Sequence, residues 1–411
     1  ESKINKKIGD KMEQNILYNE AKNFFQVFEP KGDIISVIKV PGSIQILGEV
    51  TNFNHGKVIS TNIGKSAIIM AQKRREGDRI ISFYSRKYDE KIKMTLNEPQ
   101  SKEEHGWANF IASTLFMLEG NSKKVYGMNV YIDNQIPDLF DANSTESLEI
   151  GVLYLASKFS DWQLKGAEMA QICAEGERRF MGREKSYVKY IPAIFGKKST
   201  ITLFDSSNNT EENIKFDLKN YVFLTLSSGV KKKHLEEKRK NILKEVEEAI
   251  TIMQKSGAKF SKLNELTMEQ FDEYRNKLSV LQRKRCAYFI SENERVELAR
   301  EKLLKNDIDG FASVINDSQK NIKNRLEILE EENEILIDII QDIPEIKAVR
   351  LMNMGVDGTV LVLIDKDKKN EVESRIKKTF LSRTGLELYS ETFGLDNQIE
   401  EFQINVNEFK K

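Results

Sequence analysis

The stretch that decides the fold runs from residue 40 to residue 56 and reads VPGSIQILGEVTNFNHG. The residues just before it, 34–40, are mostly apolar and β-branched, which is typical of a buried strand. Pro41 and Gly42 then predict a break, because proline cannot donate a ladder hydrogen bond and glycine weakens a strand. Further strand patterns at 57–62, 66–72 and 79–84 indicate that this part of the chain forms a sheet.

The rest of the chain mixes helix and strand patterns. Helical spacing of apolar residues predicts helices over 1–28, 107–119, 144–159, 231–254, 282–305 and 321–340. Strand patterns recur at 125–133, 201–205, 221–226 and 359–364. This order predicts an α+β protein of two domains, the first over residues 1–200 and the second over 201–411, with a cleft between them.

Composition excludes several classes of protein. The chain has 411 residues, and 64 basic side chains balance 64 acidic ones, which argues against nucleic-acid binding. Two cysteines and three histidines cannot assemble a Cys/His zinc site. The sequence has no apolar run long enough to span a membrane and no signal peptide, so the expected location is the cytoplasm.

The 40–56 stretch resembles the galactokinase signature A-P-G-R-V-N-L-I-G-E-H-T-D-Y-N-G-G without a gap. Three later stretches are similar to further motifs of that family. SENERV at 291–296 resembles T-E-N-E-R-V, ERRFMG at 177–182 resembles E-H-x-F-x-G, and RLMNMGVDGT at 350–359 corresponds to R-M-T-G-A-G-F-G-G-C. The resemblance covers nearly the whole chain. It implies the galactokinase, homoserine kinase, mevalonate kinase and phosphomevalonate kinase (GHMP) superfamily, with a ribosomal-protein-S5-like N-terminal domain and a ferredoxin-like C-terminal domain.

The resemblance implies a phosphate-binding loop, P-L-G-A-G-L-S-S-S-A-S-L-E, at residues 137–149. This chain has PDLFDANSTESLE there, so Leu139 and Asp141 replace both glycines and Glu146 is an added acid. A carboxylate ~4 Å from a phosphate oxygen opposes binding by roughly 4 kcal/mol at an effective dielectric constant near 20. Only a remnant of the nucleotide loop is expected, at Asn143, Ser144 and Thr145. The alternative interpretation is a plain helix with Asn143 or Ser144 as N-cap.

The implied catalytic groups are also replaced. The position of the family arginine is Ser43, and the position of the catalytic aspartate, twelve residues after the metal-binding glutamate, is Lys189. A lysine is protonated at neutral pH and cannot accept a proton, although it could supply the positive charge that the arginine would bring. The implied metal ligands, Glu177 and Ser144, are retained. The alternative is that Glu177 is a solvated residue on a helix face.

The implied sugar site is partly kept. The Glu, His and Asp of the family signature correspond to Glu49, Val50 and Asn52. Glu49 can accept hydrogen bonds and Asn52 can both donate and accept, whereas Val50 can do neither. Residues 43–56, 138–147 and 177–190 are expected to line one cleft.

Three functions follow from these substitutions. The first hypothesis is a galactokinase-like protein with impaired catalysis that binds a sugar, another small molecule or a protein partner in a regulatory role. The second is an active Mg-ATP-dependent sugar or small-molecule kinase with a site rearranged around Lys189. The third is a structural subunit that uses a heptad over 322–340 as a dimer seam, although packing within the domain also explains that spacing. The sequence does not identify a ligand, a pathway or an oligomeric state.

Overall fold

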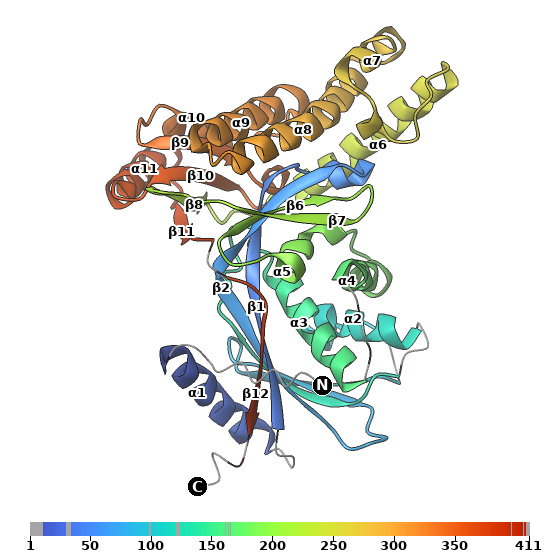
Figure 1. Cartoon of the computed structure of the whole chain (residues 1–411), viewed down its shortest axis with the longest axis vertical. Coiled ribbons are helices and arrows are strands. Elements are labelled where there is room, and N and C mark those ends of the chain that lie inside the picture. Colours follow the sequence, from blue (N-terminus) through green and yellow to red (C-terminus); the bar gives the residue numbers. More distant parts are fainter. Residues whose placement is uncertain are drawn as a thin grey trace.

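Two β-sheets organise the described part of the chain, and helices cover their faces (Figure 1). The computed structural model describes residues 11–29, 34–97, 100–120, 124–160, 162, 164, 166–395, 397–405 and 407, and the side chains of 11–14, 52 and 233 are outside that description. The strands are β1 (Ile34–Leu47), β2 (Lys57–Lys73), β3 (Ile80–Ser85), β4 (Glu90–Thr95), β5 (Met128–Asn134), β6 (Thr200–Asp205), β7 (Thr210–Lys215), β8 (Tyr221–Ser227), β9 (Ile346–Leu351), β10 (Thr359–Asp365), β11 (Tyr389–Phe393) and β12 (Glu400–Asn405). The helices are α1 (Lys11–Phe28), α2 (Ala108–Gly120), α3 (Ser144–Phe159), α4 (Gly166–Met181), α5 (Ile191–Phe195), α6 (Lys233–Lys255), α7 (Met268–Asp272), α8 (Val280–Leu304), α9 (Ile308–Asn321), α10 (Glu331–Gln341) and α11 (Lys369–Thr384).

The first sheet has the order β12-β1-β2-β5-β3-β4, and β6 and β7 extend it from β2. Its pairs are antiparallel except β3 with β5. β1 is buried along nearly its whole length because both faces of the sheet are covered. Phe24 of α1 packs against Ile35 and Tyr131 on one face, and α2, α3, α4 and α5 lie over the other.

The second sheet is antiparallel with the order β11-β8-β10-β9. Helices α6, α8, α10 and α11 bury apolar residues against it in a separate core that includes Leu224, Val362 and Phe380. In Figure 1 these helices form the upper part of the molecule, and α6 and α7 project from it. The two sheets confirm the α+β class expected from the sequence.

The break predicted at Pro41 and Gly42 is wrong, because β1 continues through both residues to Leu47 with a bulge between Pro41 and Ser43. Gly42 is needed there for close packing. A Cβ atom on it would lie 2.9 Å from the carbonyl oxygen of Ala142 and 2.8 Å from Ile136 Cγ2. The bulge therefore brings β1 directly against the loop that precedes α3.

The sheets divide the chain differently from the boundary expected at residue 200. Strands β6 and β7, which follow that residue, belong to the first sheet, and β12 returns to pair with β1. A strand near the C-terminus thus completes the first sheet. Its pairing is favourable because β12 covers an edge of β1 that would otherwise expose unpaired backbone groups. The division into the domains 1–200 and 201–411 remains a prediction.

The single helix predicted over 321–340 is wrong. One π-helical turn, η6 (Ile322–Leu326), ends at Glu327, whose φ of 52° is left-handed, and α10 begins only at Glu331. The heptad residues Ile322, Leu326, Asn333, Leu336 and Ile340 are buried inside the second core. Their spacing therefore reflects packing within the chain, as the alternative interpretation proposed.

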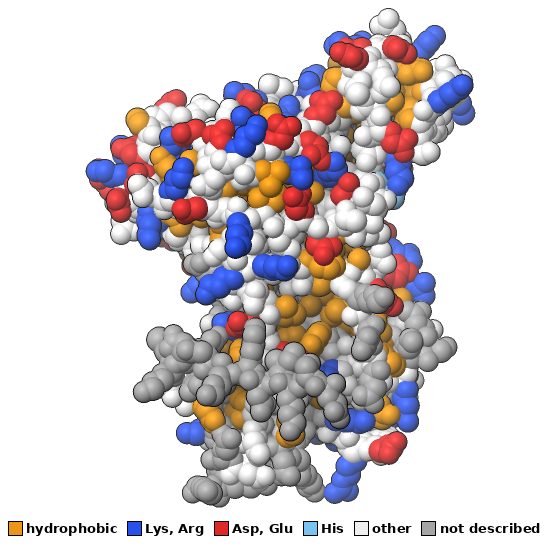
Figure 2. Space-filling view, in the orientation of Figure 1, with side chains coloured by type: hydrophobic (Ala, Val, Ile, Leu, Met, Phe, Trp, Pro, Cys, Tyr) orange, Lys and Arg blue, Asp and Glu red, His pale blue; other side chains and the backbone are white. Residues whose placement is uncertain are grey.

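The surface carries intermixed charges. On the face shown in Figure 2, basic and acidic side chains alternate over the upper helices and do not separate into large patches of one sign. Among the helices of the described residues, none has the length and apolar character needed to cross a bilayer.

Candidate functional site

A cavity of about 590 Å³ lies where several segments of the chain meet. Its walls come from the loop before α3 and the first turn of that helix, from the start of α2, and from residues within 183–189 and 353–357. Residues at the ends of β3 and β5, and Lys231 and Glu236 near the start of α6, complete the lining. Asn143, Ser144 and Thr145, which the sequence assigned to a nucleotide-loop remnant, are all in its wall, as is Lys189. A cavity of this volume suits a small-molecule ligand.

Ser43 and the loop before α3 are joined directly. The backbone N–H of Ser43 donates to the carbonyl oxygen of Ala142 at 3.0 Å, and Asn143 Nδ2 donates to Ser43 Oγ at 3.0 Å. Ser43 is fully buried, so its hydroxyl acts within the protein and is not one of the groups that line the cavity. Asn143 stands at the N-cap position of α3, but its side chain makes no capping bond because it reaches Ser43 instead.

Three residues of the loop before α3 have left-handed backbone, and one of them, Asp141, stands at an implied glycine position. Phe140, Asp141 and Asn143 have φ values of 76°, 49° and 51°, in the left-handed region. This conformation is a genuine outlier for a bulky residue such as Phe140, and such strain concentrates at functional sites. Phe140 is held in place because its side chain is buried in the first core. Leu139, at the other implied glycine position, does not have a left-handed backbone.

Lys189 is paired with a carboxylate of that loop. It lies in the short helix η3 (Tyr187–Lys189), and its Nζ donates to Asp141 Oδ1 at 2.8 Å. Burial raises the pKa of Asp141 to about 6, against the opposing effect of Lys189, and Asp357 and Glu49 raise it further. Burial would lower the pKa of Lys189, but Asp141, Glu146 and Glu49 raise it above its ordinary value. Lys189 is therefore a fixed cation and not a base.

Asp141 should make stability depend on pH. Its pKa in the folded protein lies above the ordinary value of 3.8, so the folded chain keeps a proton that the unfolded chain loses. The stabilisation that comes from this proton is therefore complete below about pH 4. The free energy of unfolding then falls by roughly 2–3 kcal/mol as the pH rises to about 6. In Asp141→Asn that fall should disappear, which urea unfolding at several pH values would measure. Equal pH profiles for the parent and the variant would contradict the assignment, and Asp317→Asn is an exposed control.

Glu177, the implied metal ligand, is fully buried and is held by a lysine. Lys185 Nζ forms an ion pair with Glu177 Oε1 and lies 3.2 Å from Glu146 Oε1. The interpretation of Glu177 as a solvated face residue is therefore wrong. Burial alone would lower the pKa of Lys185, but the surrounding carboxylates of Glu146, Glu149 and Glu177 raise it well above its ordinary value.

The hydroxyl group of Ser144, the second implied metal ligand, also has a partner within the protein. Ser144 Oγ accepts a hydrogen bond from Asn134 Nδ2 at 2.8 Å. No group of three or more His, Cys, Asp or Glu side chains arranged to hold a metal ion occurs in the part of the chain that the structure describes. These residues do not fit a Mg²⁺ ion as they stand, because the ammonium group of Lys185 already neutralises the carboxylate of Glu177.

A buried tyrosine completes this cluster. Tyr190 donates its hydroxyl hydrogen to Glu149 Oε2 at 2.5 Å, and the Tyr190 hydroxyl oxygen also lies 3.3 Å from Glu177 Oε1. Burial raises the pKa of Glu149 well above its ordinary value, with Lys185 opposing the change. The cluster thus contains more carboxyl groups than cations, and Lys185 supplies the positive charge that offsets them.

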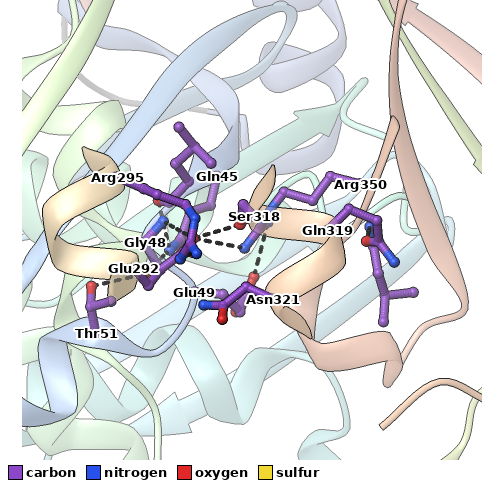
Figure 3. A network of polar contacts seen from close by, with 12 residues as sticks. Gln45, Gly48, Glu49, Thr51, Glu292, Arg295, Ser318, Gln319, Asn321 and Arg350 are labelled. Carbon is purple, nitrogen blue, oxygen red and sulfur yellow. Dashed lines mark hydrogen bonds and ion pairs between the residues drawn. The ribbon is translucent and has the colours of Figure 1, made fainter. Parts of the chain in front are cut away.

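Glu49, at the implied sugar position, is buried outside the cavity wall. Its Oε2 accepts from the backbone N–H of Asn353 at 3.1 Å and lies 3.7 Å from Arg350 Nη1. Figure 3 shows this part of the molecule, where Arg295 and Glu292 from α8 meet Ser318 from α9 beside the turn that contains Gly48 and Glu49. The side chain of Asn52 lies outside the described residues, and its backbone belongs to η1 (Thr51–Asn54).

Several residues of the site were not identified from the sequence. Lys185 follows Arg183 and Glu184 in an ordinary charged stretch, and nothing in its spacing marks it as the partner of Glu177. Trp107 and Phe110 form an aromatic wall of the cavity but have apolar helix spacing like any core residue. Asp357 lies in the stretch RLMNMGVDGT, and its side chain accepts a hydrogen bond from Asn353 Nδ2 at 2.8 Å in the cavity wall.

Comparisons with known proteins found relatives in sequence and in fold. No protein-family model matches the chain. A galactokinase of Staphylococcus saprophyticus is 25% identical over 374 residues, which span 90% of this chain and 96% of the relative. A galactokinase of Thermotoga maritima is 23% identical over 351 residues, or 85% of this chain and 95% of the relative.

Solved structures share the fold. Lactococcus lactis galactokinase complexed with galactose superposes with a TM-score of 0.86 at 21% identity, over 94% of this chain and 100% of that one. A mevalonate kinase superposes with a TM-score of 0.58 at 17% identity, over 87% of this chain and 99% of that one. The chain is therefore similar to galactokinases over most of its length, and it has the α+β fold of the solved galactokinase and mevalonate kinase structures.

Proposed function

We propose that this chain is a galactokinase-like protein that binds a sugar or similar small molecule and does not transfer phosphate. One observation carries the proposal: lysines occupy both places where the chemistry would happen. Lys189 stands at the implied position of the base and is paired with Asp141, and Lys185 is paired with Glu177, the implied metal ligand. Phosphoryl transfer needs a metal ion and an oriented hydroxyl group, and neither requirement is met by these residues.

The lining of the cavity favours an uncharged or zwitterionic ligand. Its basic residues are Lys87, Arg183, Lys185, Lys189 and Lys231, and its acidic residues are Asp138, Asp141, Glu146, Glu236 and Asp357. The two sets are equal in number, so the wall offers no excess positive charge to a triphosphate. Tyr88, Trp107 and Phe110 supply an apolar surface for the flat face of a ring. The Lactococcus lactis structure contains galactose, which makes galactose the first sugar to test.

The active kinase remains the second candidate, and one observation favours it. The backbone at Asp141, the second implied glycine position of the loop before α3, is left-handed, which is a conformation that glycine adopts readily in a phosphate cradle. In that case the carboxylates are the barrier to nucleotide, because they hold Lys185 and Lys189 in ion pairs.

Isothermal titration of the parent chain and of Asp141→Gly with Glu146→Ala tests the proposal. The parent should bind galactose or a related sugar and should not bind Mg-ATP. The double variant removes two negative charges, frees Lys189 and leaves Lys185 paired with Glu177 alone. It should therefore bind Mg-ATP with a dissociation constant of about 1 mM or lower, a gain of several kcal/mol in the charge term.

The matched control is Asp365→Gly with Glu371→Ala, which removes the same residue types from outside the cavity. Tight Mg-ATP binding by the parent would overturn the proposal. Failure of the double variant to bind would show that the shape of the loop, and not its charge, excludes nucleotide.

A further inference from the structure

A second groove, distant in sequence from the loop before α3, lies between α8, α9 and η6. It has a volume of about 490 Å³ and is open to solvent. Three basic side chains line it, Arg295, Lys320 and Arg325, together with two acidic residues, Glu294 and Asp317. The function proposed above does not use this groove.

Three hydrogen-bond donors share one acceptor at its base. Ser291 Oγ accepts hydrogen bonds from Arg325 Nη1 at 2.7 Å, from Arg295 Nη1 at 3.1 Å and from Asn321 Nδ2 at 3.2 Å. A hydroxyl oxygen has two lone pairs, so it cannot satisfy three donors fully. The same hydroxyl donates its own hydrogen to the carbonyl oxygen of Ala287 at 2.6 Å. Each donor has one other acceptor, which is Ala287 O for Arg325, Glu292 Oε2 for Arg295 and Tyr288 O for Asn321. The three donors nevertheless converge on a single neutral oxygen, and two of them are guanidinium groups.

Positive charge is also in excess at that point. Since Arg295 and Arg325 contact the same oxygen, their Nη1 atoms are no more than about 6 Å apart, where like charges repel. Arg295 has a carboxylate 3.4 Å away, on Glu292. Arg325 has no carboxylate within 4 Å among the residues that the structure describes, and it is half-buried. A desolvated guanidinium without an acid is the usual partner of a carboxylate or phosphate.

The π-helical turn explains why Arg325 points there. An α-helix continuing from α9 would present residues at 3.6 per turn, whereas η6 winds more widely over Ile322–Leu326. The turn places Arg325 against α8, where its Nη1 also donates to the carbonyl oxygen of Ala287. Single π-helical turns are rare and occur frequently at functional sites.

We propose that the groove between α8, α9 and η6 binds an oxyanion, a carboxylate or phosphate group of a small metabolite, through Arg295, Arg325 and Asn321. The bound group would accept the donors that now share Ser291 Oγ. It would also draw Arg295 away from Glu292, whose other carboxylate oxygen accepts from Gly48 N at 3.3 Å and from Ser318 Oγ at 2.7 Å. Occupancy of the groove is thereby linked to the turn that carries Glu49 (Figure 3).

Titration of the full chain with inorganic phosphate and, separately, with sodium acetate tests the site, at constant ionic strength with chloride as balance. Thermal unfolding and calorimetry should both detect binding, with a dissociation constant of roughly 1–10 mM for the preferred anion. Arg325→Gln should weaken binding at least about tenfold, or 1.4 kcal/mol. The preferred anion identifies which oxyanion the groove selects.

Lys323→Gln is the matched control, because it removes one positive charge from the same turn at a residue outside the groove that pairs with Glu334. Its affinity should equal that of the parent. Arg325→Lys keeps the charge and should give an intermediate affinity, which covers the case in which Arg325→Gln does not fold. Unchanged affinity in both Arg325 variants, equal loss in Lys323→Gln, or no binding of either anion by the parent would overturn the proposal.

Discussion

Replacing Arg350 by methionine should lower the free energy of unfolding by about 3–5 kcal/mol, because a buried ion pair would lose one partner. Arg350 is fully buried, and its guanidinium lies 3.7 Å from Glu49 and 3.8 Å from Glu292. Its Nε also donates to Ser318 Oγ at 3.0 Å. Removing the cation leaves two buried carboxylates without their shared partner. Urea unfolding followed by circular dichroism would measure the loss.

Two further variants make this prediction specific. Arg375→Met removes an exposed arginine that lies 3.7 Å from Glu345, the same distance as the Arg350 pair with Glu49, and should change stability by no more than about 0.5 kcal/mol. Glu292→Gln should lower the free energy of unfolding less in the Arg350→Met variant than in the parent chain, because the two residues interact. A loss below 1 kcal/mol for Arg350→Met, roughly the value of an exposed pair, would contradict this account of the network.

Replacing Lys185 by methionine should have an effect of similar size. The ammonium group balances Glu146 and Glu177, and its loss would leave those carboxylates and Glu149 in a buried cluster. We expect a loss of about 3–5 kcal/mol at neutral pH. The loss should be smaller at low pH. Burial raises the pKa of Glu149, so at low pH this carboxyl group is protonated and needs no cation. The loss of stability returns as the pH rises through that pKa.

Divalent cations should partly restore the Lys185→Met variant. Removal of the ammonium group leaves buried carboxylate oxygens, which are the ligands that Mg²⁺ and Mn²⁺ prefer. Millimolar Mn²⁺ should therefore raise the unfolding temperature of the variant and leave that of the parent unchanged. Lys377→Met is the control, since its pair with Glu373 at 2.7 Å is partly exposed. If Mn²⁺ has no effect on Lys185→Met, Lys185 does not take the place of a metal ion.

The sequence predicted the fold well because the motifs that define it are local. The 40–56 stretch, the helix over 144–159 and the strands at 221–226 and 359–364 depend on patterns within a few residues, and the structure contains each of them. The misjudged features depend on distant partners. The bulge at Gly42 is decided by Ala142, and the edge of β1 is covered by β12 more than 350 residues later.

The site was predicted less completely for the same reason. Comparison of motifs identified Ser43 and Lys189 as substitutions, but it could not show that Asn143 would turn from its cap position to Ser43. It identified Asp141 as a new charge but not the ion pair that neutralises it. Lys185 carries no motif, so its pairing with Glu177 becomes visible only when α4 and the following loop are placed in space.

Phosphate transfer from ATP to galactose is the most direct test of the central claim, which is that Lys185 and Lys189 replace the metal ion and the base. The measurement is release of ADP at saturating galactose and Mg-ATP, with Lys189→Ala in parallel. We expect no turnover from either protein above the rate without protein. Turnover of about one per second or faster by the parent, lost in Lys189→Ala, would contradict the claim and establish an active kinase that uses this lysine.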